Sequence, residues 1–121
     1  RMDSEGGLLA DGLYRDEVDL FRGMGGTLCE LTGLAVAPGE DSPEVLRALF
    51  QAAYMVGHRR FGASDVFIEV NPRHVSYYRR IGFRPVGTMR MCPRVAAPAI
   101  LMHLDLDDWE QETLLKQRIA A

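Results

Sequence analysis

Apolar residues recur along the chain with two different periods, which separate predicted helices from predicted strands. Between residues 45 and 61 they follow helical spacing, and Ser42 before Pro43 is a typical helix start. A long helix is therefore predicted over 42–60 and ends before Gly62. Shorter helices are predicted over 16–22, 74–81 and 107–121, and strands over 27–36, 65–70, 83–91 and 99–106.

This order of elements predicts an α/β (α+β) fold, because strands joined through helices form a mixed sheet with parallel neighbours. The strand over 27–36 is apolar on both faces apart from Glu30, as an interior strand would be. We expect one domain over 1–121, in which 1–26 is a lead-in, 27–106 the core and 107–121 a C-terminal helix. Residues 1–13 are rich in glycine and polar, and they are predicted to be extended.

Composition narrows the class of protein. With 121 residues, 47% hydrophobic and 26% charged, the chain is too apolar to be disordered and long enough for one core. Its longest uncharged apolar run, 95–102, falls far short of the ~18 residues of a membrane span, and no export signal is visible at the start. Cys29 and Cys92 fit neither a disulfide scaffold nor a zinc pair, so we predict a cytoplasmic protein without a metal site.

Charge is unevenly distributed along this acidic chain, whose net charge is −3. Residues 58–94 hold eight arginines against Asp65 and Glu69, whereas the flanking segments are acidic. A basic segment in an acidic protein indicates a local anionic partner. It does not indicate nucleic-acid binding, because proteins that bind nucleic acid are usually basic overall. A solvated arginine-rich face is the alternative.

Residues 71–83, NPRHVSYYRRIGF, resemble the segment of GNAT-superfamily acyltransferases that runs from a strand end through a tyrosine-bearing helix into a Gly-Phe strand start. Tyr78, four residues before Gly82, matches the position of that tyrosine. Together with 29–36 and 95–106, the chain looks most like the long-chain N-acyl amino acid synthases, relatives of the acyl-homoserine-lactone synthases, over about residues 27–106. The resemblance implies a GNAT-like mixed, splayed central sheet with flanking helices, its N-terminal part reduced or missing.

The function implied by this resemblance is N-acyl transfer. A long-chain acyl group would move from a thioester, on acyl carrier protein or CoA, to the amine of a small acceptor such as an amino acid. Glu40 and Asp41 occupy the loop where relatives that use acetyl-CoA cradle a pyrophosphate, which favours acyl-phosphopantetheine on a carrier protein. Gly33 stands where related synthases often carry arginine, which bears on acceptor binding and activity. No permanently bound cofactor is expected.

Within that reaction, Tyr78 is the candidate that protonates the leaving thiolate, and Glu30 is the candidate base or ammonium ligand. The alternatives are that Tyr78 packs the core and that Glu30 pairs with an arginine. Tyr77, Glu69 and His103 are interpreted mainly as structural. Donor contacts are expected from backbone groups of the splayed strand and from the strand end, where His74 could instead cap the helix: Leu34, Ala35, Val36, Ser42, Asn71 and His74.

Five arginines at the ends of predicted elements are candidates for docking the acidic surface of a carrier protein: Arg59, Arg60, Arg73, Arg79 and Arg80. Two other functions remain open, a CoA-dependent N-acetyltransferase and an inactive GNAT-like module that binds an acyl ligand or a protein. A homodimer that completes a short domain is a further possibility at this point.

Overall fold

A computed structural model of the chain describes residues 1–31, 51–52, 55–93 and 96–120. Within these residues the fold is mixed α+β, with a π-helical turn (η1) and a 3-10 turn (η2) beside the regular elements. In chain order these are α1 (Asp11–Gly23), β1 (Leu28–Glu30), η1 (Met55–Arg60), β2 (Asp65–Val70), η2 (Pro72–His74), α3 (Val75–Ile81), β3 (Arg84–Pro85), β4 (Arg90–Cys92), β5 (Ala97–Asp105) and α4 (Leu106–Ala120).

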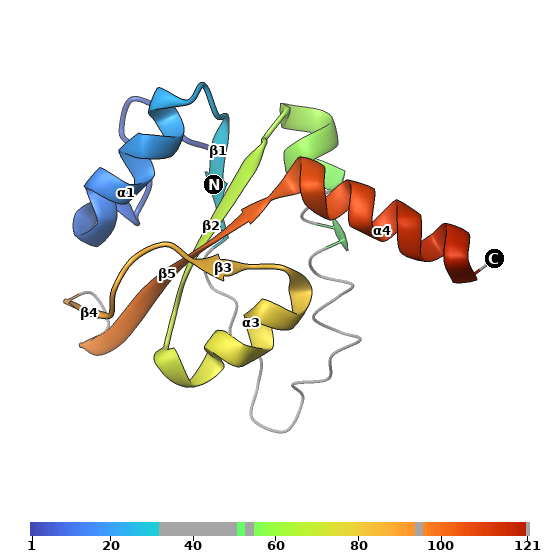
Figure 1. Cartoon of the computed structure of the whole chain (residues 1–121). Helices are drawn as coiled ribbons and strands as arrows, with labels where there is room; N and C mark the ends of the chain where they lie inside the picture. The colour runs from blue at the N-terminus through green and yellow to red at the C-terminus, as the bar shows by residue number, and fades with distance from the viewer. Residues whose placement is uncertain (32–50, 53–54, 94–95, 121) are drawn as a thin grey trace.

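The described strands form one five-stranded mixed sheet (Figure 1). Its order is β1-β2-β5-β3, and β4 pairs with β5 as well. β1 runs parallel to β2, whereas β2, β3 and β4 are all antiparallel to β5. The last described strand in the sequence is thus the central one, and it pairs with the whole length of β2, from Asp65 opposite Asp105 to Val70 opposite Ile100.

Alternation along β2 divides the core between the two faces of the sheet. Val66, Ile68 and Val70 join a cluster that includes Tyr78 of α3 and Leu106 of α4. Phe67 joins a second cluster with Tyr14 and Val18 of α1. Helix α1 therefore covers one face, and α3 with the start of α4 covers the other.

Four predicted elements are confirmed within two residues at each end: β2, α3, β5 and α4. The helix predicted over 16–22 starts earlier, at Asp11. The prediction that 1–13 are an extended lead-in was wrong at its end, because α1 begins at Asp11, and Leu8 and Ala10 before it are buried. Arg22 fastens this segment, with its guanidinium 2.7 Å from a carboxylate oxygen of Asp3 and 2.6 Å from one of Asp11.

The strand predicted over 83–91 is broken into β3 and β4. Tyr14 of α1 lies against the break, and its hydroxyl is 2.7 Å from the carbonyl oxygens of both Thr88 and Ala99, to either of which it can donate. A Cβ at Gly87 would lie 2.7 Å from the Tyr14 ring, so only glycine lets the chain pass. The break follows from a side chain far away in the sequence.

The end of the predicted long helix is a π-helical turn, not an α-helical one. In this wider turn the carbonyl of Gly57 accepts the N–H of Ala63, a fully buried residue, at 2.9 Å. Gly62, at φ +71, ends the turn. Residues 32–50 and 53–54 lie outside the described residues, and with them most of this helix and most of the strand 29–36 that is predicted to splay.

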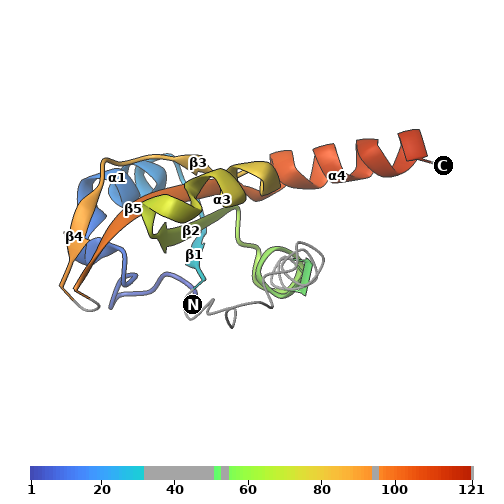
Figure 2. The same ribbon diagram turned by 90° about the horizontal axis from the view of Figure 1, so that it is seen from below.

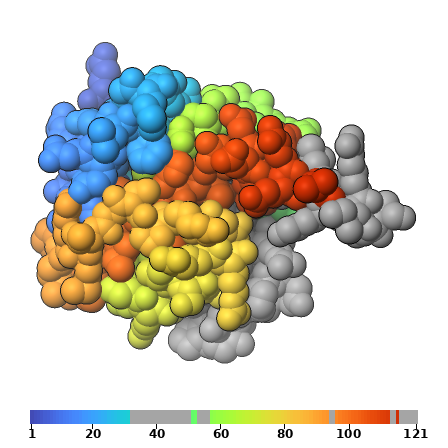
Figure 3. Space-filling model, in the orientation of Figure 1, coloured from blue at the N-terminus to red at the C-terminus, as the bar shows by residue number. Residues whose placement is uncertain are grey.

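Helix α4 follows β5 directly and runs past the end of the sheet (Figure 2). Its first turns lie between η1 and α3 on the face shown in Figure 3. Among the described residues, none of the helices combines the length and the apolar character needed to cross a membrane.

Candidate active site

Tyr78 lies on α3, whose two ends are set by the local sequence. Asn71 accepts the N–H of Arg73 at 3.1 Å, and Pro72 opens the 3-10 turn that leads into the helix. Gly82, at φ +124, ends α3 in a conformation that favours glycine.

The Tyr78 side chain is held among aromatic rings. It is buried, and its ring meets those of Tyr77 and Phe83 edge-on, at centroid distances of 5.7 and 6.0 Å. Burial raises the pKa of Tyr78 above its ordinary value, so the phenol is protonated at neutral pH.

The neighbouring hydroxyl of Tyr77 was not singled out from the sequence as functional. Its oxygen is buried, and within the described residues it has no hydrogen-bond partner. An unsatisfied buried hydroxyl costs about 1–3 kcal/mol, and a bound substrate atom could satisfy it. The sequence signal that could have identified Tyr77 is its place next to Tyr78 on a short predicted helix.

Glu30 lies at the end of β1, 3% exposed, and its carboxylate meets the start of α1. One oxygen accepts the N–H of Leu9 at 2.6 Å, the other that of Ala10 at 3.2 Å, and Arg1 lies 3.9 Å away. Ala10 precedes α1 without a side-chain cap of its own, so Glu30 supplies the missing acceptors. This geometry supports the structural alternative considered for Glu30, while its catalytic role stays a prediction.

The structure does not bring Glu30 and Tyr78 together on one side of the sheet. Along β1, Leu28 packs in the cluster on the α1 face and Cys29 in the cluster that contains Tyr78. Glu30 bonds to the residues that lead into α1, and it therefore lies on the α1 face, opposite Tyr78.

The predicted donor contacts are placed only in part. Asn71 caps η2 and His74 is exposed at the start of α3, where its ring makes no capping hydrogen bond and its Nε2 accepts from Arg73 at 3.2 Å. Leu34, Ala35, Val36 and Ser42 lie outside the described residues, as do Gly33, Glu40 and Asp41.

All five candidate docking arginines are exposed: Arg59, Arg60, Arg73, Arg79 and Arg80. Arg59 lies 3.5 Å from Glu110 of α4, and a Cβ at Gly82, just after Arg79 and Arg80, would lie 3.8 Å from the ring of Trp109. Arg73 is one element away, at the other end of α3.

Asp65 and His103 form a polar pair on the α1 face of the sheet. The sequence predicted a mainly structural role for His103 and no role for Asp65. His103 Nε2 lies 2.6 Å from Asp65, whose other oxygen accepts the Ser64 hydroxyl at 2.6 Å, and Phe21 stacks on the imidazole at 4.1 Å. Burial by itself raises the pKa of Asp65, but the hydrogen bonds from His103 and Ser64 outweigh it and hold the pKa below its usual value. The pair joins the end of α1 to β2 and β5.

The cysteine thiols are buried. Burial raises the pKa of Cys29 to about 11, so its thiolate is scarce at neutral pH. Cys29 is therefore poorly suited to act as a nucleophile at neutral pH.

A mixed sheet covered by a short helix with a buried tyrosine, as α3 carries Tyr78, is the arrangement of GNAT-like acyltransferases. A solved structure with this fold, titled "The structure of FeeM, an N-acyl amino acid synthase from uncultured soil microbes", matches with a TM-score of 0.81 and 29% sequence identity. The match covers 96% of this chain but 65% of the FeeM chain, so this chain spans less than two thirds of its length. No curated protein sequence matches significantly.

The family model described as "N-acyl amino acid synthase FeeM" matches residues 1–105. The chain therefore belongs to the FeeM family of N-acyl amino acid synthases. This confirms the resemblance on residues 71–83 and the expected GNAT-like fold with flanking helices.

Proposed function

We propose that the protein is an N-acyltransferase that moves a long-chain acyl group from a thioester to the amine of a small acceptor such as an amino acid. The observation that carries this proposal is the family match across residues 1–105, which includes the whole described sheet. In the reaction the amine nitrogen attacks the thioester carbonyl, the C–N bond forms and the C–S bond breaks. The amine loses one proton, and the leaving thiolate takes one up.

We assign Tyr78 as the group that protonates the leaving thiolate. Its position on α3 is that of the tyrosine in the segment that carries the resemblance, and its raised pKa keeps it protonated until the thiolate develops. Proton transfer to a thiolate with an ordinary conjugate pKa of about 8.5 then requires a site without bulk water. The aromatic surroundings of Tyr78 support such a site.

We further propose acyl carrier protein as the donor, with acyl-CoA as the alternative. Exposed arginines on η2 and α3, Arg73, Arg79 and Arg80, suit an acidic partner surface. Three acidic residues at the start of α4 lie between Arg59 and α3: Asp107, Asp108 and Glu110. Their negative charges would repel the acidic surface of a carrier protein. Docking is therefore expected to depend more on the arginines of α3 than on Arg59 or Arg60.

Amide formation tests the proposed function. Purified protein is incubated with a long-chain acyl-carrier protein or acyl-CoA and a panel of amino acids, and N-acyl products are identified by mass spectrometry. Product from the carrier-bound donor supports the full proposal, and product from acetyl-CoA alone would identify an N-acetyltransferase. Binding of donor without any product would contradict the proposal and identify an inactive acyl-binding module.

Tyr78→Phe is the decisive variant. Because the ring remains and the proton is lost, we expect kcat to fall about 100-fold or more while KM for the donor changes little. Tyr77→Phe is the matched control for the assignment of the proton donor, and we expect it to change KM more than kcat. An unchanged kcat in Tyr78→Phe would contradict the assigned role.

A further inference from the structure

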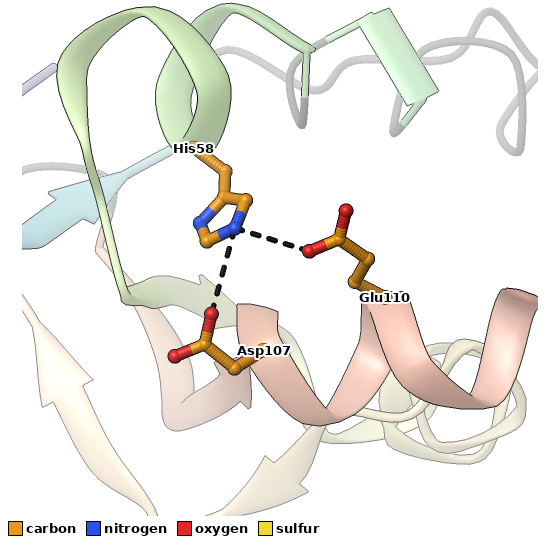
Figure 4. Close-up of side chains that lie close together, drawn as sticks. All are labelled: His58, Asp107 and Glu110. Carbon is orange, nitrogen blue, oxygen red and sulfur yellow. Dashed lines mark ion pairs between the residues drawn. The ribbon is translucent and has the colours of Figure 1, made fainter.

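His58, Asp107 and Glu110 form a cluster that the reaction does not use (Figure 4). The imidazole comes from η1, and the two carboxylates come from the first turns of α4. His58 Nε2 lies 3.5 Å from an Asp107 oxygen and 3.3 Å from a Glu110 oxygen. All three ligand atoms lie within 4.8 Å of one another.

The hydrogen bond of the other imidazole nitrogen, Nδ1, determines whether Nε2 faces the carboxylates with a proton or with a lone pair. Nδ1 lies 2.6 Å from the carbonyl oxygen of Ala63, and a carbonyl only accepts, so Nδ1 carries the proton. In the neutral ring Nε2 then holds a lone pair that faces two carboxylates. A cation between these three electron-pair donors, either a proton or a metal ion, would stabilise the arrangement.

A hydrogen bond from the outer imidazole nitrogen to a backbone carbonyl is also the usual way in which proteins orient a metal-binding histidine. Ligands of a tetrahedral zinc ion lie about 3.3 Å apart, given metal–ligand bonds of about 2.0–2.1 Å. The two distances from Nε2 are close to that value. The Asp107 side chain is 66% exposed, which leaves the site open to an entering ion and to water.

We propose that His58, Asp107 and Glu110 bind one divalent cation of the zinc class. Imidazole nitrogen with carboxylate oxygen is a ligand set that zinc accepts, and a water molecule would complete the tetrahedron. Arg59, 3.5 Å from the second oxygen of Glu110, orients that carboxylate so that its other oxygen faces the ring. Because His58 lies 49 or more positions before the two carboxylates, no short motif in the sequence indicates the site.

The position of the site suggests a structural role. The family match ends at residue 105, so His58 belongs to the matched body and both carboxylates lie beyond it on α4. The cation would therefore hold the start of α4 against η1. We expect metal binding to stabilise the fold and not to supply chemistry to the acyl transfer.

Zinc titration of the chelator-treated full chain tests the proposal. We expect one Zn²⁺ per chain with micromolar or tighter affinity, and a Tm rise of about 5 °C or more at about 100 times Kd. Co²⁺ in place of zinc is expected to bind without the intense near-ultraviolet absorption of a cobalt–thiolate bond, which excludes Cys29 and Cys92 as ligands.

Matched variants separate this site from adventitious binding. His58→Ala and Glu110→Gln should each weaken zinc binding tenfold or more and remove the Tm rise, whereas Asp108→Asn and His74→Ala should change neither. If His58→Ala fails to fold, Glu110→Gln and Asp107→Asn alter only exposed or half-buried carboxylates and serve in its place. Absence of one-to-one binding, or binding that these variants leave intact, would overturn the proposal and leave an ion-pair cluster between η1 and α4.

Discussion

At the scale of single residues, the buried polar side chains of the candidate site and its surroundings have different roles. Tyr78 is a buried phenol packed among aromatic rings, which we propose as the proton donor, whereas Glu30 and Asp65 are buried acids whose hydrogen bonds hold elements together. A buried acid in an apolar strand is a valid signal of function, but it is equally a signal of a missing cap. The N–H groups of Leu9 and Ala10, just before α1, support the structural role for Glu30.

Glu30→Gln tests that distinction. Gln keeps one acceptor but no charge, and the loss of charge-assisted bonds to the N–H groups of Leu9 and Ala10 should lower the free energy of unfolding by about 1.5–3 kcal/mol. Chemical denaturation measures this loss, and amide formation by the folded variant should continue at a similar kcat. Glu5→Gln, at an exposed acid, is the control. A large fall in kcat with stability unchanged would instead establish Glu30 as catalytic.

Asp65→Asn should remove a pH-dependent contribution to stability. The pKa of Asp65 lies below its ordinary value of 3.8 in the folded chain, so its contribution is present above that value and is lost as pH falls through the lower, folded pKa. We expect a loss of about 1.5–3 kcal/mol at neutral pH, where the charged bond to His103 is intact, and a smaller difference from wild type at acid pH.

Thermal unfolding of both proteins from pH 7 to pH 3 measures that difference. Asp16→Asn, the same change at an exposed position of α1, should follow the wild-type curve. A deficit in Asp65→Asn that stays constant across the acid range would show that its carboxylate does not titrate in the predicted direction.

At the scale of elements, predictions held where a segment's own pattern decides its structure. β2 and β5 alternate or run apolar over their full lengths, and α3 lies between Pro72 and Gly82, so local signals are sufficient. The strand predicted over 83–91 failed because Tyr14, more than 70 positions away, enters it at Gly87. Periodicity within a window cannot contain such a contact.

Two glycine substitutions with opposite expected effects on stability test this explanation of the broken strand. Gly87→Ala would place a methyl 2.7 Å from the buried Tyr14 ring and should cost about 1–3 kcal/mol of stability. Gly12→Ala, in α1 with nothing within 4 Å of the new Cβ, should instead stabilise by about 0.5–1 kcal/mol. Equal effects of the two substitutions on the denaturation midpoint would contradict the packing explanation.

At the scale of the whole molecule, the candidate site was harder to predict than the fold. Tyr78 was located through its resemblance to a family segment, but the faces of the sheet could not be assigned from a strand that is apolar on both sides. Which side Glu30 occupies depends on where α1 packs, and the His58 cluster depends on where α4 begins relative to η1. These are tertiary placements that no single segment encodes.

Charge reversal tests carrier docking at this scale. Arg79→Glu and Arg80→Glu, made singly, should each weaken binding of an acyl-carrier protein about tenfold at low salt, and the difference from wild type should shrink at high salt. Arg15→Glu, at an exposed arginine on α1, should have little effect because it lies on the opposite face of the sheet. Calorimetry gives the affinities, and equal affinities for all three variants and wild type would rule out docking on α3.

The central place of β5 also determines when the protein can fold during synthesis. β1 and β2 are complete once residue 70 has emerged, yet the partner of β2 along its other edge spans residues 97–105. Until the ribosome has released that segment, the nascent chain exposes an unpaired, largely apolar strand of the kind that pairs with other chains. The nascent protein therefore depends on β5 to close its sheet, and it is most open to misassembly until residues 97–105 have emerged.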